Sequence, residues 1–339
     1  MQDGVTAAVA EQEAVRFLSS PAAYPERPAT VEHRQTHMSH VFLTPAHVFK
    51  LKKPLAHEYV DLRTLAARAA NCREEVRLNR RLAPDVYLGV VALTRDADGR
   101  YALDGGAEPV DWLVEMRRLP DQGMLDWRIA HGLRPDEVDA LGQRLGGFFA
   151  SQPAVAIGLD RYRDGLRQQL ALSMAVLARA EFALPAASLH ALRAALERYL
   201  SADGELPARV REGRIVEGHG DLRPEHICFD GVPVIIDCLE FNRALRLVDP
   251  FDEIAFLGLE CARLGAPWVG PRLRRIVEAR LSDRPPARLV AFFTALRACI
   301  RARLALAHLL EPLPRTPSKW LPLARDYLAR AERACSVLR

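Results

Sequence analysis

The chain has 339 residues, of which 49% are hydrophobic and 27% are charged, and its formal net charge at pH 7 is +4. A chain of this length is expected to fold into two packed parts rather than around one core. The mild charge, with no Lys- and Arg-rich run interleaved with aromatic residues, argues against nucleic-acid binding.

Several features favour a cytoplasmic protein that does not cross a membrane. The N-terminal segment carries acidic residues where a signal peptide needs positive charge. The sequence has no run of about 18 apolar residues that would span a bilayer. The six cysteines are scattered without a C-x-x-C pair, which argues against a zinc ribbon or a redox motif. We expect them to be reduced and to pack as small apolar side chains.

The first part of the chain is predicted to be rich in β-structure. An Ala-rich stretch to about residue 17, predicted as a short or frayed helix, is followed by a Pro-rich connector at residues 19–33. Two β-rich runs, HVFL and HVFKLK, then flank a Thr-Pro turn. Apolar or small residues at helical spacing follow and stop at Pro84. A second hairpin turns at DADG, and the strand PVDWLVEMRRLP ends at Pro120.

The remainder is predicted to be mainly helical, which makes the fold class α+β. One strand pair, at residues 216–241, interrupts these helices. Three regions result: an N-terminal extension or helix at 1–23, a β-rich lobe at 24–119 and a helical lobe at 120–339. The predicted helices cover residues 134–152, 161–183, 186–200, 249–264, 286–310 and 319–338.

The interrupting segment, VEGHGDLRPEHICFDGVPVIIDCLEF, sets titratable groups beside apolar strands. Asp221 precedes the first strand of the predicted hairpin, and Asp237 ends the second, so the two carboxylates can approach at one end. Two neighbouring ionised carboxylates repel each other unless a cation, a proton or hydrogen bonds neutralise their charge. A divalent metal at Asp237, with Asp221 acting as a base, would account for the placement.

This segment resembles a known family. His219, Asp221 and position 226, followed by a buried strand ending in Asp237, are similar to the H-x-D-x-x-x-x-N motif and metal-binding aspartate of the aminoglycoside phosphotransferase and choline kinase superfamily. The resemblance extends over about residues 24–310. It implies a protein-kinase-like fold with two lobes, a small β-rich N-lobe that binds nucleotide and a larger, mainly helical C-lobe that carries the catalytic loop and the metal-binding hairpin.

A narrower resemblance is to a bacterial aminoglycoside phosphotransferase-like branch. It is carried by HVFLT, VFKLKKP, EMRRLP, GHGDLRPEHI and IIDCLEFN. Some members of that branch have an additional C-terminal P-loop ATPase domain. No G-x-x-x-x-G-K-[ST] signature occurs here, so we expect that domain to be absent.

The resemblance implies an ATP-dependent kinase that transfers the γ-phosphate to the hydroxyl of a small molecule. Asp221 would accept the hydroxyl proton, and Asp237 would hold Mg²⁺, or alternatively Mn²⁺, against the phosphates. Glu240, which flanks Asp237, is a candidate for a supporting role. Asp249 before Pro250 is predicted to cap a helix, and Asp252 resembles a helix acid that braces the catalytic loop.

The resemblance also implies a nucleotide site in the first lobe. Lys50 and Lys52 lie two apart on a strand and therefore share a face of the sheet. Lys50 is the first candidate for the phosphate-binding lysine and Lys52 the second. For the glutamate partner, Glu75 ranks ahead of Glu74 because it shares a helix face with Leu78 and Leu82. The adenine is expected beside the hinge between the lobes, formed by residues Glu115, Met116 and Arg117.

One position departs from the family pattern: His226 stands where the second metal ligand is Asn. Imidazole nitrogen suits Zn²⁺ or Mn²⁺ better than Mg²⁺, so His226 is either a metal ligand or a hydrogen-bonding group of the loop. Two alternatives follow. One is a catalytically impaired nucleotide-binding protein. The other is a metal-dependent hydrolase using His219, Asp221, His226 and Asp237. No pattern in the sequence identifies the phosphate acceptor or the oligomeric state.

Overall fold

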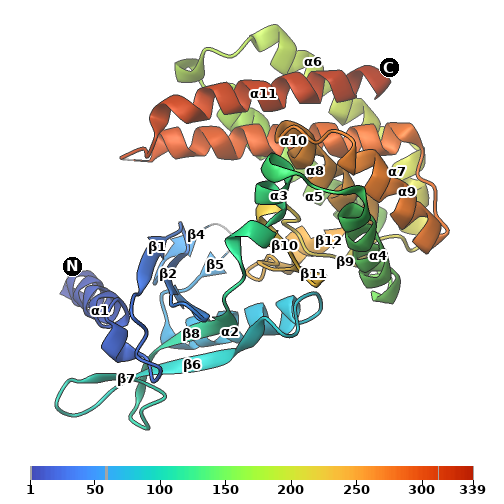
Figure 1. The fold of residues 1–339 in the computed structure, drawn as a ribbon. Coiled ribbons are helices and arrows are strands. Elements are labelled where there is room, and N and C mark those ends of the chain that lie inside the picture. Colours follow the sequence, from blue (N-terminus) through green and yellow to red (C-terminus); the bar gives the residue numbers. More distant parts are fainter. Residues whose placement is uncertain (1, 58–59, 312, 339) are drawn as a thin grey trace. The chain divides into compact units, whose positions relative to one another are not determined.

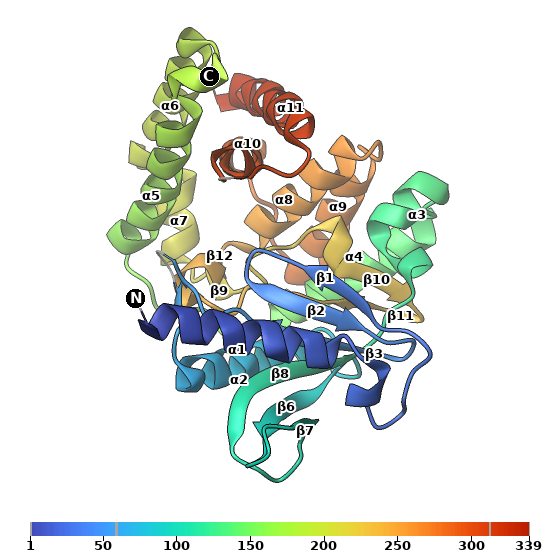
Figure 2. The same ribbon diagram turned by 90° about the vertical axis from the view of Figure 1, so that its left-hand side faces the viewer.

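The computed structural model describes residues 2–57, 60–311 and 313–338, and the chain divides into two compact units (Figures 1 and 2). The first unit comprises Met1–Met124 and His226–Arg243. The second comprises Leu125–Glu225 and Ala244–Arg339. The first unit is rich in β-structure and the second is mainly helical, so the predicted α+β class is confirmed.

The first unit is built around a six-stranded antiparallel sheet in the order β1-β2-β3-β8-β6-β7. The strands are β1 (Glu32–Gln35), β2 (Ser39–Leu43), β3 (His47–Lys52), β6 (Tyr87–Arg95), β7 (Tyr101–Leu103) and β8 (Pro109–Arg117). A separate pair is formed by β4 (Ala56–His57) and β5 (Val60–Asp61). The two predicted hairpins, β2–β3 and β6–β7, and the strand β8 are thus present.

The two faces of this sheet are covered by different elements. On one face, Leu18 of helix α1 (Gln2–Leu18) packs with Phe49 and Leu113. On the other face, Cys72 and Val76 of helix α2 (Leu65–Asn79) pack with Val114. Because neighbouring residues of a strand point to opposite faces, Lys50, which pairs with Val114, projects toward the α2 face. The sheet therefore places its strand lysines against α2.

The hairpin of β10 (Ile227–Asp230) and β11 (Val232–Ile235) belongs to the first unit. Val234 and Ile236 pack onto the apolar cluster beneath α2, and Met124 bridges to Cys228. This assignment differs from the predicted boundaries. The first lobe was predicted to end at residue 119, and the hairpin was predicted to belong to the second lobe. The difference arises because apolar side chains of the hairpin complete the core of the first unit.

The core of the second unit includes Phe292, Leu296 and Cys299 of helix α10 (Ala287–Ala307), which are all buried. A short antiparallel pair, β9 (Val216–Glu217) and β12 (Leu247–Val248), lies among the helices. The helices are α3 (Leu125–His131), α4 (Pro135–Ser151), α5 (Leu159–Leu177), α6 (Ala186–Ser201), α7 (Glu205–Arg211), α8 (Pro250–Arg263), α9 (Val269–Leu281), α10 (Ala287–Ala307) and α11 (Pro317–Cys335).

Seven of the strands and helices described here were not predicted: β1, β4, β5, β12, α3, α7 and α9. Strand β1 is polar and exposed at all four residues, so it carries no alternating apolar pattern. Helices α3 and α7 have seven residues each, which is too short for a clear period. Helix α9 opens on Val-Gly-Pro, a sequence that suggests a turn. The six longer predicted helices are all present, with ends shifted by a few residues.

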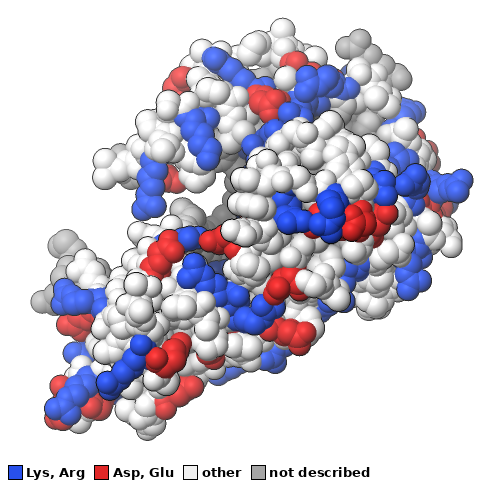
Figure 3. Space-filling model, viewed as in Figure 1, with Lys and Arg blue, Asp and Glu red and all other residues white. Residues whose placement is uncertain are grey.

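The distribution of surface charge and the burial of the cysteines agree with what the composition predicts. Figure 3 shows Lys and Arg side chains interspersed with Asp and Glu over the visible face. All six cysteines are buried and none is in a disulfide, as expected for small apolar packing groups. Of the helices that the structure describes, none combines the length and the apolar composition needed to span a membrane.

Candidate active site

Three charged side chains from separate segments of the first unit form one ion-paired cluster. Lys50 extends from β3, Glu75 from α2, and Asp237 from the segment that follows β11. The Lys50 Nζ donates to Glu75 Oε1 at 2.9 Å and to Asp237 Oδ1 at 2.6 Å. The structure thus brings together the first-ranked lysine, the first-ranked glutamate and the predicted metal-binding aspartate. Glu74, the alternative, pairs instead with Arg77 on the helix exterior.

The second strand lysine joins the same cluster from a more buried position. The Lys52 Nζ lies 2.6 Å from Glu240 Oε1 and also forms an ion pair with Glu75 Oε2. The Lys52 side chain is 1% exposed, whereas that of Lys50 is 15% exposed. Glu75 is fully buried and is therefore held between the two ammonium groups. Burial of this kind requires that each charge have a partner.

The charges of the cluster stabilise one another's ionised forms. Burial alone would raise the pKa of Glu75, but the Lys50 and Lys52 ammonium groups hold that pKa below its ordinary value. Loss of water would likewise raise the pKa of Asp237, and the charges of Lys50 and His226 lower it well below its usual range. Burial would lower the pKa of Lys50, but Asp237 and Glu75 raise it well above its ordinary value. The cluster is therefore fully charged at neutral pH.

The backbone around Asp237 is fixed by hydrogen bonds from the sheet and from α2. Asp237 has a φ of 60°, an unusual conformation for a residue other than glycine. Its N–H donates to the Tyr87 hydroxyl at 3.0 Å, and the next N–H, of Cys238, donates to Asn79 Oδ1 at 2.8 Å. These two contacts hold the strained turn in place. Sequence reasoning singled out neither Tyr87 nor Asn79.

His226 lies beside Asp237, as the resemblance implies. Its Nε2 is 3.5 Å from Asp237 Oδ2, and its side chain is nearly buried. Its carbonyl accepts a hydrogen bond from Ile236 N at 2.9 Å, which ties it to the second strand of the hairpin. The Asp237 side chain remains 43% exposed. Over the part of the chain that the structure describes, no group of three or more His, Cys, Asp or Glu side chains is arranged to hold a metal ion.

In the second unit, the predicted catalytic loop is held by Glu253 of α8. Its carboxylate accepts hydrogen bonds from His219 N at 2.9 and 3.0 Å and from Gly220 N. A Cβ on Gly218 would lie 2.6 Å from Glu253 Oε2, so the close approach needs glycine there. The brace was expected at Asp252, and this was wrong. Asp252 faces α10, where it pairs with Arg297 at 2.7 and 2.8 Å.

Asp221, the predicted base, is part of a local ion-pair chain. Arg223 Nε donates to Asp221 Oδ2 at 3.0 Å, and the same guanidinium pairs with Glu225 at 2.7 Å. The Asp221 N–H donates to His219 Nδ1 at 3.3 Å, so His219 acts as a hydrogen-bonding support. Asp221 belongs to the second unit and Asp237 to the first. The expected approach of the two carboxylates stays a prediction.

The predicted hinge residues lie at the end of β8, where they pair with β3. Met116 is buried beneath α2, while Glu115 pairs in register with Phe49. Burial raises the pKa of Glu115. Arg117 forms an ion pair of 2.7 Å with Asp230, at the turn of the β10–β11 hairpin. Their contact with adenine stays a prediction.

Asp249 caps α8, as predicted, and also belongs to a buried ionic group. Its carboxylate accepts from Phe251 N at 2.9 Å. Arg209 donates to Asp249 at 2.5 and 3.0 Å and to Asp283 at 2.6 and 2.8 Å. The start of α8 is thus fixed, and with it the position of Glu253 one turn further along.

Replacing Glu253 with Gln is expected to destabilise the protein most at low pH. Burial raises the pKa of Glu253 despite the hydrogen bonds from His219 and Gly220. The folded state therefore binds the proton more tightly than the unfolded state, and this contribution to stability declines as the pH rises above the ordinary value of 4.5. Gln does not titrate, so the difference in unfolding free energy between wild type and variant should narrow from pH 4.5 to pH 7.5. Urea unfolding at the two pH values measures it. Glu74→Gln, at a half-buried position of α2, serves as control. A difference in unfolding free energy that widens as the pH rises would contradict the expectation.

Comparisons with known proteins agree with this geometry. The model of the phosphotransferase enzyme family matches residues 58–290. An uncharacterized protein of Mycobacterium tuberculosis is 30% identical over 316 aligned residues. The match covers 89% of this chain and 60% of the relative, and an uncharacterized protein of Mycobacterium bovis gives the same values. The chain thus spans about 60% of the length of the curated relatives it matches.

Solved structures show the same fold at low identity. An aminoglycoside phosphotransferase complexed with GDP and kanamycin has a TM-score of 0.58 at 18% identity, covering 90% of this chain and 94% of that one. Choline kinase from Cryptosporidium parvum has a TM-score of 0.58 at 9% identity, with coverages of 96% and 94%. A choline/ethanolamine kinase family protein from Mesorhizobium loti gives 0.53 at 16% identity, with the same coverages. The chain belongs to the phosphotransferase enzyme family and has its protein-kinase-like fold.

Proposed function

We propose that this protein transfers the γ-phosphate of ATP to a hydroxyl group of a small molecule. The observation that carries the proposal is the cluster of Lys50, Glu75 and Asp237, three charges drawn from a strand, a helix and a hairpin end. To catalyse phosphoryl transfer, a protein must mainly position the nucleotide and neutralise charge. An ammonium held beside a partly exposed carboxylate supplies both a phosphate contact and a metal ligand.

Within this proposal Lys50, rather than Lys52, contacts the nucleotide phosphates. Lys50 is the more exposed of the two and reaches Asp237, whereas Lys52 is enclosed by Glu75 and Glu240. Lys52 would then hold Glu75 in place, and Glu75 would hold Lys50. The backbone of Glu115, Met116 and Arg117, at the end of β8, would receive the adenine.

The residues at Asp237 fit one Mg²⁺ whose remaining ligands come from phosphate and water. Mg²⁺ in such sites takes one or two carboxylates and fills its shell from the substrate, and a 43% exposed carboxylate with a lowered pKa meets that need. When bound, the ion neutralises charge on the phosphates. Asp237 would hold it, Lys50 would turn from Asp237 to the phosphates, and Asp221 would take the proton from the acceptor hydroxyl onto its carboxylate. Mn²⁺ is the alternative, because the imidazole of His226 suits it better.

The proposal requires nucleotide binding and acceptor-dependent turnover. The purified chain should bind ATP in the presence of Mg²⁺, measured by calorimetry, and should consume ATP when a library of small molecules with hydroxyl groups is added. Sugars, amino alcohols and aminoglycosides belong in that library. No binding at millimolar ATP would contradict the proposal. Soluble small molecules, rather than nucleic acid or a membrane, are the acceptors we propose.

A second candidate function is a nucleotide-binding protein with impaired catalysis. His226 favours it, because a nearly buried imidazole 3.5 Å from Asp237 occupies the position where the family places a metal-binding Asn. Under this candidate, ATP raises the unfolding temperature but no acceptor is phosphorylated.

Replacing His226 with Asn separates the two candidates. If catalysis is impaired by the imidazole, His226→Asn should raise ATP turnover at least about tenfold, since an amide oxygen is a harder ligand for Mg²⁺. Phosphate release with and without acceptor measures the change. His131→Asn, an exposed histidine of α3, is the control. An active wild type that loses turnover on His226→Asn would show that the imidazole serves catalysis.

A further inference from the structure

A pocket of about 440 Å³ lies among α8, α9, α10 and α11 of the second unit. Its floor is apolar and buried: Phe251, Ile254 and Leu259 come from α8. Half-buried Val290 and Thr294 of α10 close one side. Pockets of this size and composition are the usual binding places for small molecules.

The rim of this pocket carries a surplus of positive charge. Four arginines and a single carboxylate, Glu278, line it. Two of the arginines are already partnered: Arg274 pairs with Glu278 at 2.6 Å, and Arg330 with Asp326 at 2.9 Å. The other two, Arg275 and Arg333, are exposed, and their guanidinium groups form no hydrogen bond or ion pair with any residue that the structure describes. The apolar floor is therefore bordered by two guanidinium groups that are not in direct contact with a described carboxylate, although the charge of Arg275 acts on Asp139 at longer range.

The pocket and the catalytic loop lie on opposite faces of α8. At about 100° per residue, Phe251, Ile254 and Gly258 share one face of the helix, whereas Glu253 falls on the far side. Glu253 holds the backbone of the predicted catalytic loop, and the first set lines the pocket. At the pocket, α8 and α9 also come very close, since a Cβ on Gly258 or Gly270 would lie 2.9 Å from the other's Cα. The pocket is thus separate from the proposed reaction site.

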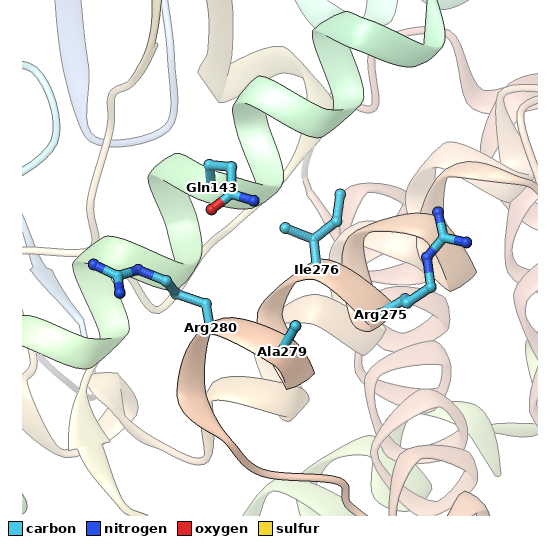
Figure 4. A pocket seen from close by; sticks show the side chains of 5 residues that line it. All are labelled: Gln143, Arg275, Ile276, Ala279 and Arg280. Atoms are coloured by element: carbon cyan, nitrogen blue, oxygen red, sulfur yellow. The ribbon is translucent and has the colours of Figure 1, made fainter.

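A second hollow, across α9, has a different character (Figure 4). It has a volume of about 380 Å³ and is lined by Gln143 of α4 and four residues of α9. Figure 4 shows Arg280 reaching along α4 near Gln143, while Arg275 extends away from Gln143 on the other side of α9. This hollow has no comparable apolar floor. Arg275 is the residue that the two share.

We propose that the pocket among α8, α9, α10 and α11 binds an amphipathic anion. The ligand has an apolar body, which the floor residues of α8 receive, and a carboxylate or phosphate group, which Arg275 and Arg333 hold. Guanidinium groups pair well with both kinds of anion. A purely apolar ligand would make no charged contact with the two arginines. A small anion without an apolar part would leave the apolar floor in contact with water. The inference does not depend on the phosphotransferase activity.

Four probes with the same eight-carbon chain test the chemistry: octanoate, octyl phosphate, octan-1-ol and octyltrimethylammonium. Calorimetry on the full chain should show that both anions bind at least about tenfold more tightly than the alcohol, because hydrogen bonds to a charged group are stronger than those to a neutral hydroxyl. The cation should not bind. The relative affinities of octanoate and octyl phosphate identify the preferred anionic group. Equal binding of the alcohol and the anions, or no binding of any probe at millimolar concentration, would overturn the proposal.

Two variants locate the binding. Arg275→Gln combined with Arg333→Gln should weaken both anions about tenfold or more. Arg325→Gln, on an exposed position of the same helix α11, should leave them unchanged. Ala262→Leu, which adds bulk from a half-buried lining position, should weaken all probes, with folding checked by urea unfolding. Full anion affinity in the double arginine variant would place the binding elsewhere and refute the assignment. ATP affinity, measured in parallel, should be the same in all variants.

Discussion

Replacing Asp221 with Asn is expected to lower the rate of phosphate transfer by about a hundredfold to ten-thousandfold, the usual contribution of a general base. The amide matches the carboxylate in size but does not accept the hydroxyl proton. Affinity for ATP should change little, because the residues proposed to hold the nucleotide are Lys50 and the end of β8. Initial rates of ATP consumption with a turned-over acceptor and calorimetric ATP titration measure the two quantities separately.

The control for Asp221→Asn removes a second carboxylate from the same ion-pair chain. Glu225 also pairs with Arg223, at 2.7 Å. Glu225→Gln therefore disturbs the same guanidinium without touching the proposed base, and it should keep transfer within about threefold of wild type, the scale expected when a partly exposed ion pair is lost. If Asp221→Asn keeps the wild-type rate, or if both variants lose activity equally, the assignment of the base to Asp221 is wrong.

The charged cluster was partly predictable because the family resemblance pointed to a strand lysine, a helix glutamate and Asp237, and local periodicity ranked the candidates for the first two. Alternation along HVFKLK placed Lys50 and Lys52 on the same side of the sheet, and in the structure both reach Glu75. Helical spacing ranked Glu75 ahead of Glu74 through the face shared with Leu78 and Leu82. In the structure Glu75 is fully buried, and Glu74 pairs with Arg77 on the exterior.

What could not be predicted depends on contacts between segments distant in the chain. Tyr87 and Asn79 fix the backbone at Asp237 and Cys238 from 150 and 159 residues away. No local pattern marks a tyrosine at a strand start or an asparagine at a helix end for that purpose. The positive φ of Asp237 is equally unmarked, since such a turn would suggest glycine.

The catalytic-loop brace illustrates the same limit at one residue. The family resemblance pointed to Asp252, and its neighbour Glu253 makes the contacts with the loop. Adjacent helix positions point about 100° apart, so a motif that places an acid at the start of a helix does not fix which of two acids faces the loop. That choice depends on how α8 is rotated, which Asp249, Arg209 and Asp283 set.

Replacing Glu75 with Gln is expected to destabilise the protein by about 3–5 kcal/mol, the usual cost of removing one partner from a buried ion pair. Glu75 is fully buried and is shared by two lysines, of which Lys52 is 1% exposed. The neutral amide leaves Lys52 with Glu240 alone and Lys50 with Asp237 alone. Urea unfolding at pH 7 measures the loss. Glu74→Gln, one residue away at a half-buried position paired with Arg77, should lie within about 0.5 kcal/mol of wild type.

The double variant Lys52→Met with Glu75→Gln shows whether the loss comes from the uncompensated charge. Removing both members of a buried pair leaves no unpaired ammonium behind, so the double variant should be less destabilised than the sum of the single variants, by about 1–3 kcal/mol. If the losses in unfolding free energy of the two single variants simply add up in the double variant, Glu75 stabilises the fold by packing rather than by charge. That result would also weaken the proposal that Lys52 holds Glu75, and Glu75 holds Lys50, for the nucleotide. ATP affinity of Glu75→Gln, measured on the folded protein, completes the test: an affinity equal to wild type would show that Lys50 needs no glutamate to bind phosphate.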